Sequence, residues 1–145
     1  MTIESHVIPE YNTIVFVHTG RVPDDEFLAF YETFFKSSTF QPSINILVDL
    51  RETHSSVRSP EALLRFAKSM EKRLDDINES TKVAVVAPKD LSFGLARMYK
   101  VLADSVNWNF VVFRALDAAL AWLGLPEDLT IHESSGSDSS TEAEL

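Results

Sequence analysis

The chain has 145 residues, 45% of them hydrophobic, which is the usual size and composition of one globular domain. It contains no cysteine, and this excludes disulfides, thiolate metal sites and thiol nucleophiles. Its net charge is −9, but the charge is uneven: residues 1–125 hold 16 acidic and 13 basic residues, whereas residues 126–145 hold six acidic and no basic ones. Because no basic surface is evident, we expect no nucleic-acid partner.

The sequence shows neither the features of a signal peptide nor those of a membrane-spanning segment. The first ten residues lack the basic start and apolar run of a signal peptide, and no later apolar stretch approaches the roughly 20 residues of a membrane span. We therefore expect a cytoplasmic protein.

A β-hairpin and a helix are predicted at the start of the chain. Residues 12–19 (NTIVFVHT) are apolar and β-branched with loose alternation, and residues 3–8 form a weaker run that can pair with them across residues 9–11. After Pro23, three acidic residues open a stretch with apolar residues at i, i+3 and i+4, the pattern of an amphipathic helix. Those apolar residues are Phe27, Phe30, Tyr31, Phe34 and Phe35.

Three strand–helix units follow in the prediction. The strands are short apolar runs of the kind covered on both faces of a sheet, at residues 44–50, 83–87 and 110–113. Ser59 caps the helix after the first of them, Asp90 caps the next helix, and the last helix begins at Ala115 and stops before Gly124. The predicted order ββαβαβαβα indicates an α/β fold, in which an N-terminal hairpin joins a mostly parallel sheet covered by helices.

The domain boundary is predicted near residue 129. Residues 1–129 are expected to form a single α/β domain, because every apolar periodic segment lies within them. Residues 130–145 are rich in Ser, Asp and Glu, and such a composition buries too little apolar surface to offset the entropy of ordering it. We expect this segment to be a disordered acidic tail.

A polar contact site is predicted at the carboxyl edge of the sheet. In open α/β sheets, ligands bind beyond the carboxyl ends of the strands, where loops and helix starts supply hydrogen-bond donors. The candidate anion or partner-contact residues at this edge are Arg51, Ser55, Ser56, Arg58, Ser59, Lys89, Asp90, Ser92 and Arg114. The alternative is structural: Ser59 and Asp90 cap helices, and Asp49 and Arg51 orient the loop that follows them.

No arrangement of residues in the sequence indicates catalysis, a metal or a cofactor. None of the four histidines has a second histidine or a carboxylate at i, i+4 on a predicted helix, and the four glycines are isolated, so neither a zinc motif nor a phosphate-binding loop is present. His54 lies beside Ser55, but no nucleophile-elbow pattern surrounds them. We expect a non-enzymatic protein, and a small enzyme of unknown class is kept as an alternative.

The predicted first helix is dense in aromatic residues. With Phe40, it places six rings within residues 27–40. Periodic apolar residues on a helix that covers a sheet are buried by default, so core packing is expected. The alternatives are a ligand cavity, a membrane contact or the interface of a homodimer.

Three segments carry a family resemblance: ILVDLRETHSS at residues 46–56, VAVVAPKDLSFGLARMY at residues 83–99, and FVVFRALDAALAWLGL at residues 110–125. With this spacing, the sequence resembles the STAS-like (SpoIIAA-like, STAS/SEC14) family of small bacterial proteins over residues 3–125. The resemblance implies a SpoIIAA-like fold.

Two groups of relatives give different expectations of function. Anti-sigma factor antagonists bind a protein kinase partner and are switched by phosphorylation of a serine in a D-S-S/T-G-L-G type motif; here the sequence after Leu50 reads RETHSSVRS, without glycine, and Ser55, Ser56 and Ser59 occupy the region of that serine. SEC14-type domains imply an apolar ligand or a membrane contact. The resemblance therefore implies a binding or regulatory module with a protein partner. The alternative is a carrier of an apolar, lipid-like ligand or a membrane-associated domain, and its candidate ligand residues are the aromatic residues Phe27, Phe30, Tyr31, Phe34 and Phe35, with Phe27, Tyr31 and Phe34 expected to line the cavity.

Overall fold

The computed structural model describes residues 2–41, 43–53, 59–71, 81–102 and 109–129. The elements within these residues follow the predicted order, with one 3₁₀ turn, η1, added in the hairpin. Their bounds are β1 (Thr2–Ile8), η1 (Pro9–Tyr11), β2 (Thr13–Gly20), α1 (Asp24–Lys36), β3 (Asn45–Thr53), α2 (Pro60–Glu71), β4 (Lys82–Val86), α3 (Asp90–Leu102), β5 (Asn109–Phe113) and α4 (Leu116–Leu123).

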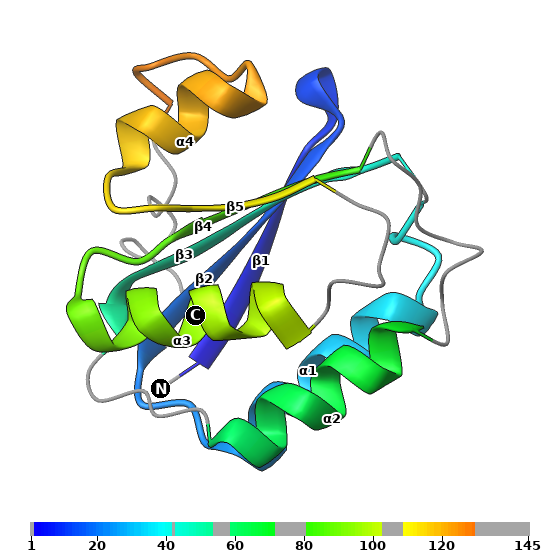
Figure 1. Ribbon diagram of the computed structural model, residues 1–145. Coiled ribbons are helices and arrows are strands. Elements are labelled where there is room, and N and C mark those ends of the chain that lie inside the picture. Colours follow the sequence, from blue (N-terminus) through cyan, green and yellow to red (C-terminus); the bar gives the residue numbers. More distant parts are fainter. Residues whose placement is uncertain (1, 42, 54–58, 72–80, 103–108, 130–145) are drawn as a thin grey trace.

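The five strands form one sheet in the order β1-β2-β3-β4-β5 (Figure 1). β1 pairs antiparallel with β2, as expected of a hairpin, and the pairs β2–β3, β3–β4 and β4–β5 are parallel. The predicted α/β class and mostly parallel sheet are confirmed. The carboxyl ends of β2 to β5 consequently meet at one edge of the sheet.

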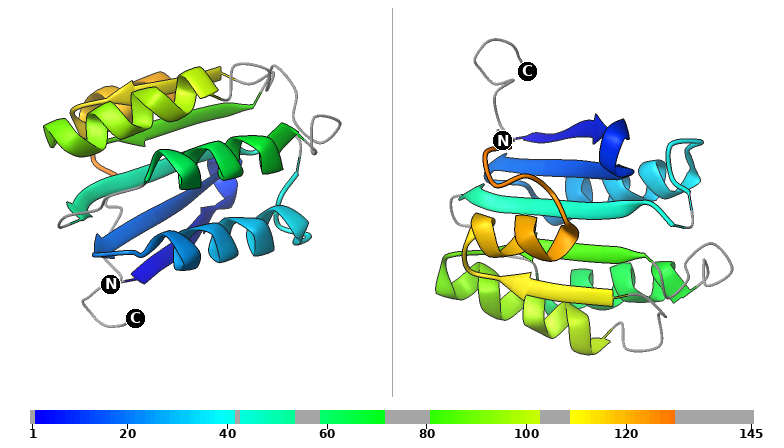
Figure 2. Two further views of the ribbon diagram at one scale, coloured as in Figure 1. Left: turned by 60° about the horizontal axis from the view of Figure 1, so that its bottom comes forward. Right: turned by 90° about the horizontal axis from the view of Figure 1, so that it is seen from above.

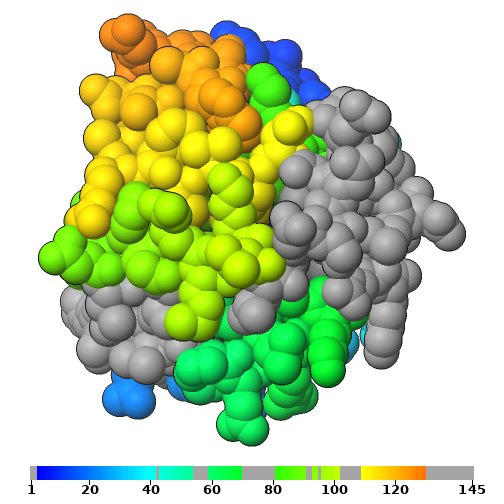
Figure 3. Space-filling model, in the orientation of Figure 1, coloured from blue at the N-terminus to red at the C-terminus, as the bar shows by residue number. Residues whose placement is uncertain are grey.

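Helices cover the two faces of the sheet unequally. α1, α2 and α3 lie on one face and α4 lies on the other, as two further views show (Figure 2). On the molecular surface α3 lies between α2 and α4 (Figure 3). Alternation along the strands supplies both cores: Ile14 and Phe16 pack towards α1–α3, whereas Val15 and Val17 pack with the α4 side.

Two helix ends behave as the sequence predicts. The Ser59 hydroxyl accepts a hydrogen bond from the backbone N–H of Ala62 at 3.0 Å, which caps α2. α4 ends at Gly124, whose φ of 77° lies in the left-handed region that glycine adopts without steric cost.

β3 runs three residues beyond its predicted end at Leu50. Val17 pairs with Asp49 but Thr19 pairs with Glu52, so β3 contains one residue more than β2 over this interval. After the bulge, the polar residues Glu52 and Thr53 belong to the strand because their backbones pair with β2, and not because their side chains alternate between apolar and polar. The apolar run at residues 44–50 therefore gives no sign of the extension.

Several expectations fall outside the described residues. They include the disordered tail predicted at residues 130–145 and the predicted contact residues Ser55, Ser56 and Arg58. Within the residues that are described, no helix is both long enough and apolar enough to cross a membrane.

Candidate functional site

A cavity of about 110 Å³ lies between the sheet and the three helices on one of its faces. Helices contribute seven lining residues, Phe27, Tyr31, Phe35, Leu63, Phe66, Ala96 and Tyr99. Strands contribute the rest, Phe16, His18, Ile46, Val48, Leu50, Thr53, Val83, Val85 and Phe110. The cavity is therefore apolar on nearly all sides, and the elements around it come from most of the chain.

The aromatic residues of α1 divide between the cavity and the core. Phe27, Tyr31 and Phe35 follow one another at i, i+4 and i+8, share one line along the helix and line the cavity. Phe30 and Phe34 pack on the ring of Phe16 instead, with ring centroids 5.5 and 4.8 Å apart.

The expectation that Phe34 lines the cavity is therefore wrong, and Phe30 does not line it either. A one-residue step turns a side chain by about 100° around a helix. Phe34 consequently points towards Phe40 and the sheet, with a centroid distance to Phe40 of 5.6 Å. The cavity itself lies between the sheet and the helices α1, α2 and α3.

A buried polar pair faces the cavity from β2 and α1. The Nε2 atom of His18 and the hydroxyl of Tyr31 are hydrogen-bonded at 2.7 Å, and the two residues are 5% and 4% exposed. Their rings are stacked, with centroids 5.9 Å apart. His18 follows Ile14 and Phe16 at period two, so strand alternation directs it towards α1.

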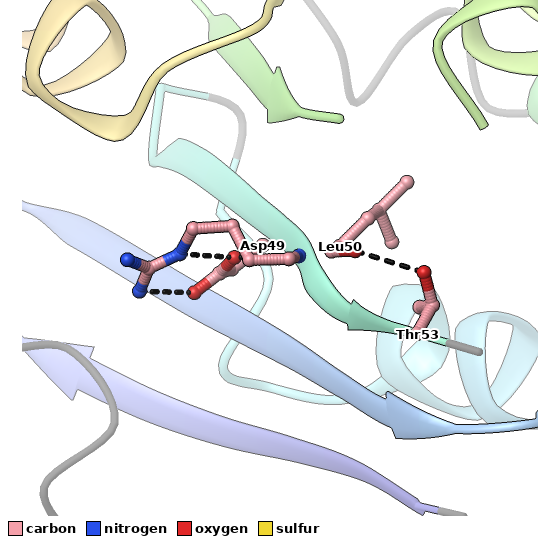
Figure 4. A network of polar contacts seen from close by, with 4 residues as sticks. Asp49, Leu50 and Thr53 are labelled. Carbon is pink, nitrogen blue, oxygen red and sulfur yellow. Dashed lines mark hydrogen bonds and ion pairs between the residues drawn. The ribbon is translucent and has the colours of Figure 1, made fainter. Parts of the chain in front are cut away.

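The end of β3 also lines the cavity. Thr53 lies an odd number of residues after Val48 and Leu50, yet it lines the same cavity, because the extra residue in β3 reverses the alternation. Its hydroxyl donates to the carbonyl of Leu50 at 2.8 Å (Figure 4), and its own carbonyl accepts a hydrogen bond from Nζ of Lys89. Thr53 thus connects the end of β3 to Leu50 within the same strand and to Lys89, the residue before α3.

Tyr99 of α3 adds a further hydroxyl-bearing ring. It is buried and lies against Phe66 and Phe110, with centroids 5.1 and 5.2 Å away. Burial raises the pKa of the Tyr99 hydroxyl well above its ordinary value near 10, because the phenolate would lose its hydration. Tyr99 is consequently neutral throughout the physiological range.

Arg51, a predicted contact residue, forms an internal ion pair. Its Nε and NH2 groups donate to the two carboxylate oxygens of Asp49 at 2.9 Å each, and its backbone N–H donates to Asp49 Oδ1 at 3.0 Å (Figure 4). The Asp49 side chain is 1% exposed and that of Arg51 28%. Hydrogen bonding to Asp49 raises the pKa of Arg51 further above its ordinary range. This geometry agrees with the structural alternative, in which the two residues orient each other and the end of β3.

A second polar cluster joins the ends of β4 and β5. Arg114 donates to the carboxylate of Asp90 at 2.6 Å and to the carbonyl of Pro88 at 3.2 Å, and its guanidinium lies 4.0 Å from the centroid of Phe93. The side chains of Asp90 and Arg114 are 94% and 50% exposed. Asp90 is the first residue of α3, and its carboxylate accepts this hydrogen bond from the arginine. With Lys89, three of the predicted edge residues are therefore close together.

The remaining predicted edge residues are placed unevenly. Ser59 caps α2, as described above, and also donates to a carboxylate oxygen of Asp24 at 3.0 Å, which links the starts of α2 and α1. Ser92 lies in the first turn of α3. Ser55, Ser56 and Arg58 lie outside the described residues, as does His54.

The described residues contain no cluster of metal-binding side chains. Among the described residues, no group of three or more His, Asp and Glu side chains is arranged to hold a metal ion. His6 lies on β1 with its Nε2 atom 3.7 Å from a carboxylate oxygen of Glu4, and it does not line the cavity.

Sequence reasoning missed the polar part of the cavity. From the sequence, His18 is considered only as a possible metal ligand. Its position two residues after Phe16 nevertheless places both side chains on the face of the sheet that α1 covers. Tyr99 lies on α3, and nothing in the sequence of that helix signals the neighbouring void. The signal for His18 was available in the strand period, whereas the cavity volume was not.

The fold is a five-stranded, mostly parallel sheet with three helices on one face and one on the other, and a mostly apolar cavity lies beneath the three helices. The comparisons with known proteins agree on the fold. Residues 13–124 match the SpoIIAA-like family, and the chain belongs to this family.

One solved structure of low identity has the same fold. It is a crystal structure of an uncharacterized protein of the DUF3478 family, with a SpoIIAA-like fold, from Shewanella loihica PV-4. The alignment has a TM-score of 0.55 and 18% sequence identity, and it covers 84% of this chain and 92% of the other. None of the curated proteins compared with the chain matches it.

Proposed function

We propose that this SpoIIAA-like domain is a non-enzymatic module that binds a small apolar molecule in the cavity beneath α1, α2 and α3. The cavity itself is the observation that carries the proposal. Protein interiors are packed as densely as organic crystals, and voids larger than a water molecule are few in each domain. A space of about 110 Å³ lined by rings and aliphatic groups is therefore a candidate binding site for an apolar molecule.

The lining favours binding over chemistry. Apart from His18, Tyr31, Thr53 and Tyr99, every lining side chain is a hydrocarbon. An apolar molecule that enters gains roughly 25 cal/mol for each Å² of its apolar surface removed from water, together with the dispersion contacts that the void lacks.

Cavity filling provides the test. Ala96 lines the cavity from α3, so Ala96→Leu places additional methyl groups inside it, whereas Ala118→Leu on the exposed side of α4 is a matched control. Native mass spectrometry of freshly purified protein is expected to show a non-covalent adduct on the wild type and on Ala118→Leu that Ala96→Leu lacks. Organic extraction then identifies it.

The opposite results are equally clear. A wild-type protein without an adduct, whose melting temperature does not respond to any compound of an apolar panel, refutes the proposal. So does an adduct that Ala96→Leu retains at the wild-type level, because such a ligand is bound elsewhere.

We propose a second function for the exposed polar cluster, the binding of a protein partner at the carboxyl edge of the sheet. What supports it is the exposure of Asp90 and Arg114, which leaves this ion pair open to a partner at an edge where α/β domains recognise ligands. Arg114→Glu places two acidic groups together and is expected to abolish recovery of a partner in a pull-down, with Arg65→Glu on exposed α2 as control. Equal recovery by both variants removes this surface from consideration.

A further inference from the structure

The size of the cavity limits what it can hold. A cavity of about 150 Å³ lined by aliphatic and aromatic side chains is known to accept benzene, and a water molecule occupies about 30 Å³ in the liquid. The cavity described here, at about 110 Å³, is smaller than the one that accepts benzene, so a single six-membered ring is the largest rigid body that suits it. A lipid acyl chain exceeds it unless α1 moves away from the sheet.

The lining is aromatic to an unusual degree. The rings of Phe27, Phe66, Tyr99 and Phe110 follow one another around the cavity, with successive centroids 5.1, 5.1 and 5.2 Å apart. Aromatic pairs prefer edge-to-face or offset contacts at centroid distances of about 4.5–7 Å, and these contribute beyond the burial of area. A flat ring inside such a belt finds several favourable contacts, whereas an aliphatic chain gains from area alone.

The polar groups of the lining define the other half of the ligand. None of the described lining residues is Lys, Arg, Asp or Glu, so the lining has no permanently charged side chain to pair with an ionised carboxylate or ammonium group. The His18–Tyr31 pair, more than nine-tenths buried, presents a hydroxyl and an imidazole to the cavity. A hydroxyl has one donor and two acceptor positions and an imidazole has two nitrogens, so this pair can include a ligand hydroxyl in its hydrogen bonding.

We infer that the ligand is a neutral single-ring aromatic compound with one hydrogen-bonding substituent, of the phenol type. Its ring lies in the aromatic belt and its hydroxyl points at Tyr31 and His18. This inference rests on the proposed binding function and adds the chemical class and orientation of the ligand.

Three probes and two variants test the inference by isothermal titration calorimetry on the full chain. The probes are phenol, benzene and hexanoate, which share an apolar body but differ in the hydroxyl, the ring and the charge. Tyr31→Phe removes the hydroxyl of Tyr31 and keeps its ring at the cavity. Tyr11→Phe removes an exposed hydroxyl in η1 and is the matched control.

We expect phenol to bind the wild type and Tyr11→Phe equally, and roughly tenfold more weakly to Tyr31→Phe, the loss of one hydrogen bond. Benzene is expected to bind all three proteins alike, and hexanoate to bind none. If Tyr31→Phe does not fold, intermolecular NOEs on the wild type decide: contacts from the phenol protons beside the hydroxyl to the Tyr31 ring support the orientation, and contacts to Phe110 instead overturn it.

The outcomes separate this inference from the proposed function. Phenol affinity that is unchanged in Tyr31→Phe, or hexanoate binding tighter than phenol, overturns the ligand class while leaving a functional cavity. If none of the three probes binds but a larger apolar compound co-purifies, the ligand class is likewise overturned and the proposed binding function stands. Failure of all three probes with no co-purified compound overturns both.

Discussion

Removal of the Arg51 side chain tests how the end of β3 is held. The carboxylate of Asp49 is 1% exposed and is bonded by the guanidinium through both oxygens, whereas the Arg51 side chain is 28% exposed. Breaking a fully buried ion pair by deleting one partner typically costs 3–5 kcal/mol, because the remaining charge is left in a poorly solvated site. Since water reaches the arginine side of this pair and the Arg51 backbone N–H still bonds Asp49, we expect Arg51→Ala to cost about 2–3 kcal/mol.

Substitution of the other partner of the ion pair, Asp49, should cost less stability. Asp49→Asn keeps an acceptor for the Arg51 backbone N–H, and the freed guanidinium can turn towards water, so we expect a cost of about 1 kcal/mol. The double variant is expected to be more stable than the sum of the two losses predicts, because a neutral asparagine does not need the cation.

Urea denaturation measures these differences as shifts of the midpoint at a constant m-value. Arg65→Ala, on the exposed side of α2, serves as control and should stay within about 0.5 kcal/mol of the wild type. The reasoning is refuted if Arg51→Ala is as stable as the control, or if Asp49→Asn is the more costly change. If the expected loss is found, Arg51 variants report on folding as well as on binding, and Arg114 is the better probe of the polar edge.

Two further predictions concern a helix cap and a buried phenol. Ser59→Ala removes the α2 cap and the bond to Asp24, so we expect it to lower the free energy of unfolding by about 1–2 kcal/mol in thermal or urea denaturation, with the exposed Ser38→Ala unchanged; equal stability of the two variants would count against both bonds. Because burial raises the pKa of Tyr99, the unfolded chain deprotonates first, and stability from this group is present below pH 10 and falls as the pH rises above it. Tyr99→Phe is therefore expected to weaken the alkaline loss of stability in urea titrations between pH 9 and 11, and an unchanged slope would show that Tyr99 does not contribute to it.

The sequence by itself determined the elements of this protein and their order. The i, i+3, i+4 spacing of the rings in α1, the serine and proline at the start of α2 and the apolar run of β4 are local patterns. Each reflects a preference of a few consecutive residues, so each can be interpreted without knowledge of the neighbours. The parallel sheet followed from the alternation of strands and helices.

The tertiary structure alone decided the site. The extension of β3 depends on pairing with β2, and only the resulting bulge turns Thr53 into the cavity. His18 and Tyr31 belong to different elements, and which rings of α1 line the cavity depends on where the sheet, α2 and α3 lie around that helix. A void is the difference between the space that the packed elements enclose and the side chains that fill it, and it depends on distances between distant segments that no local pattern of residues encodes.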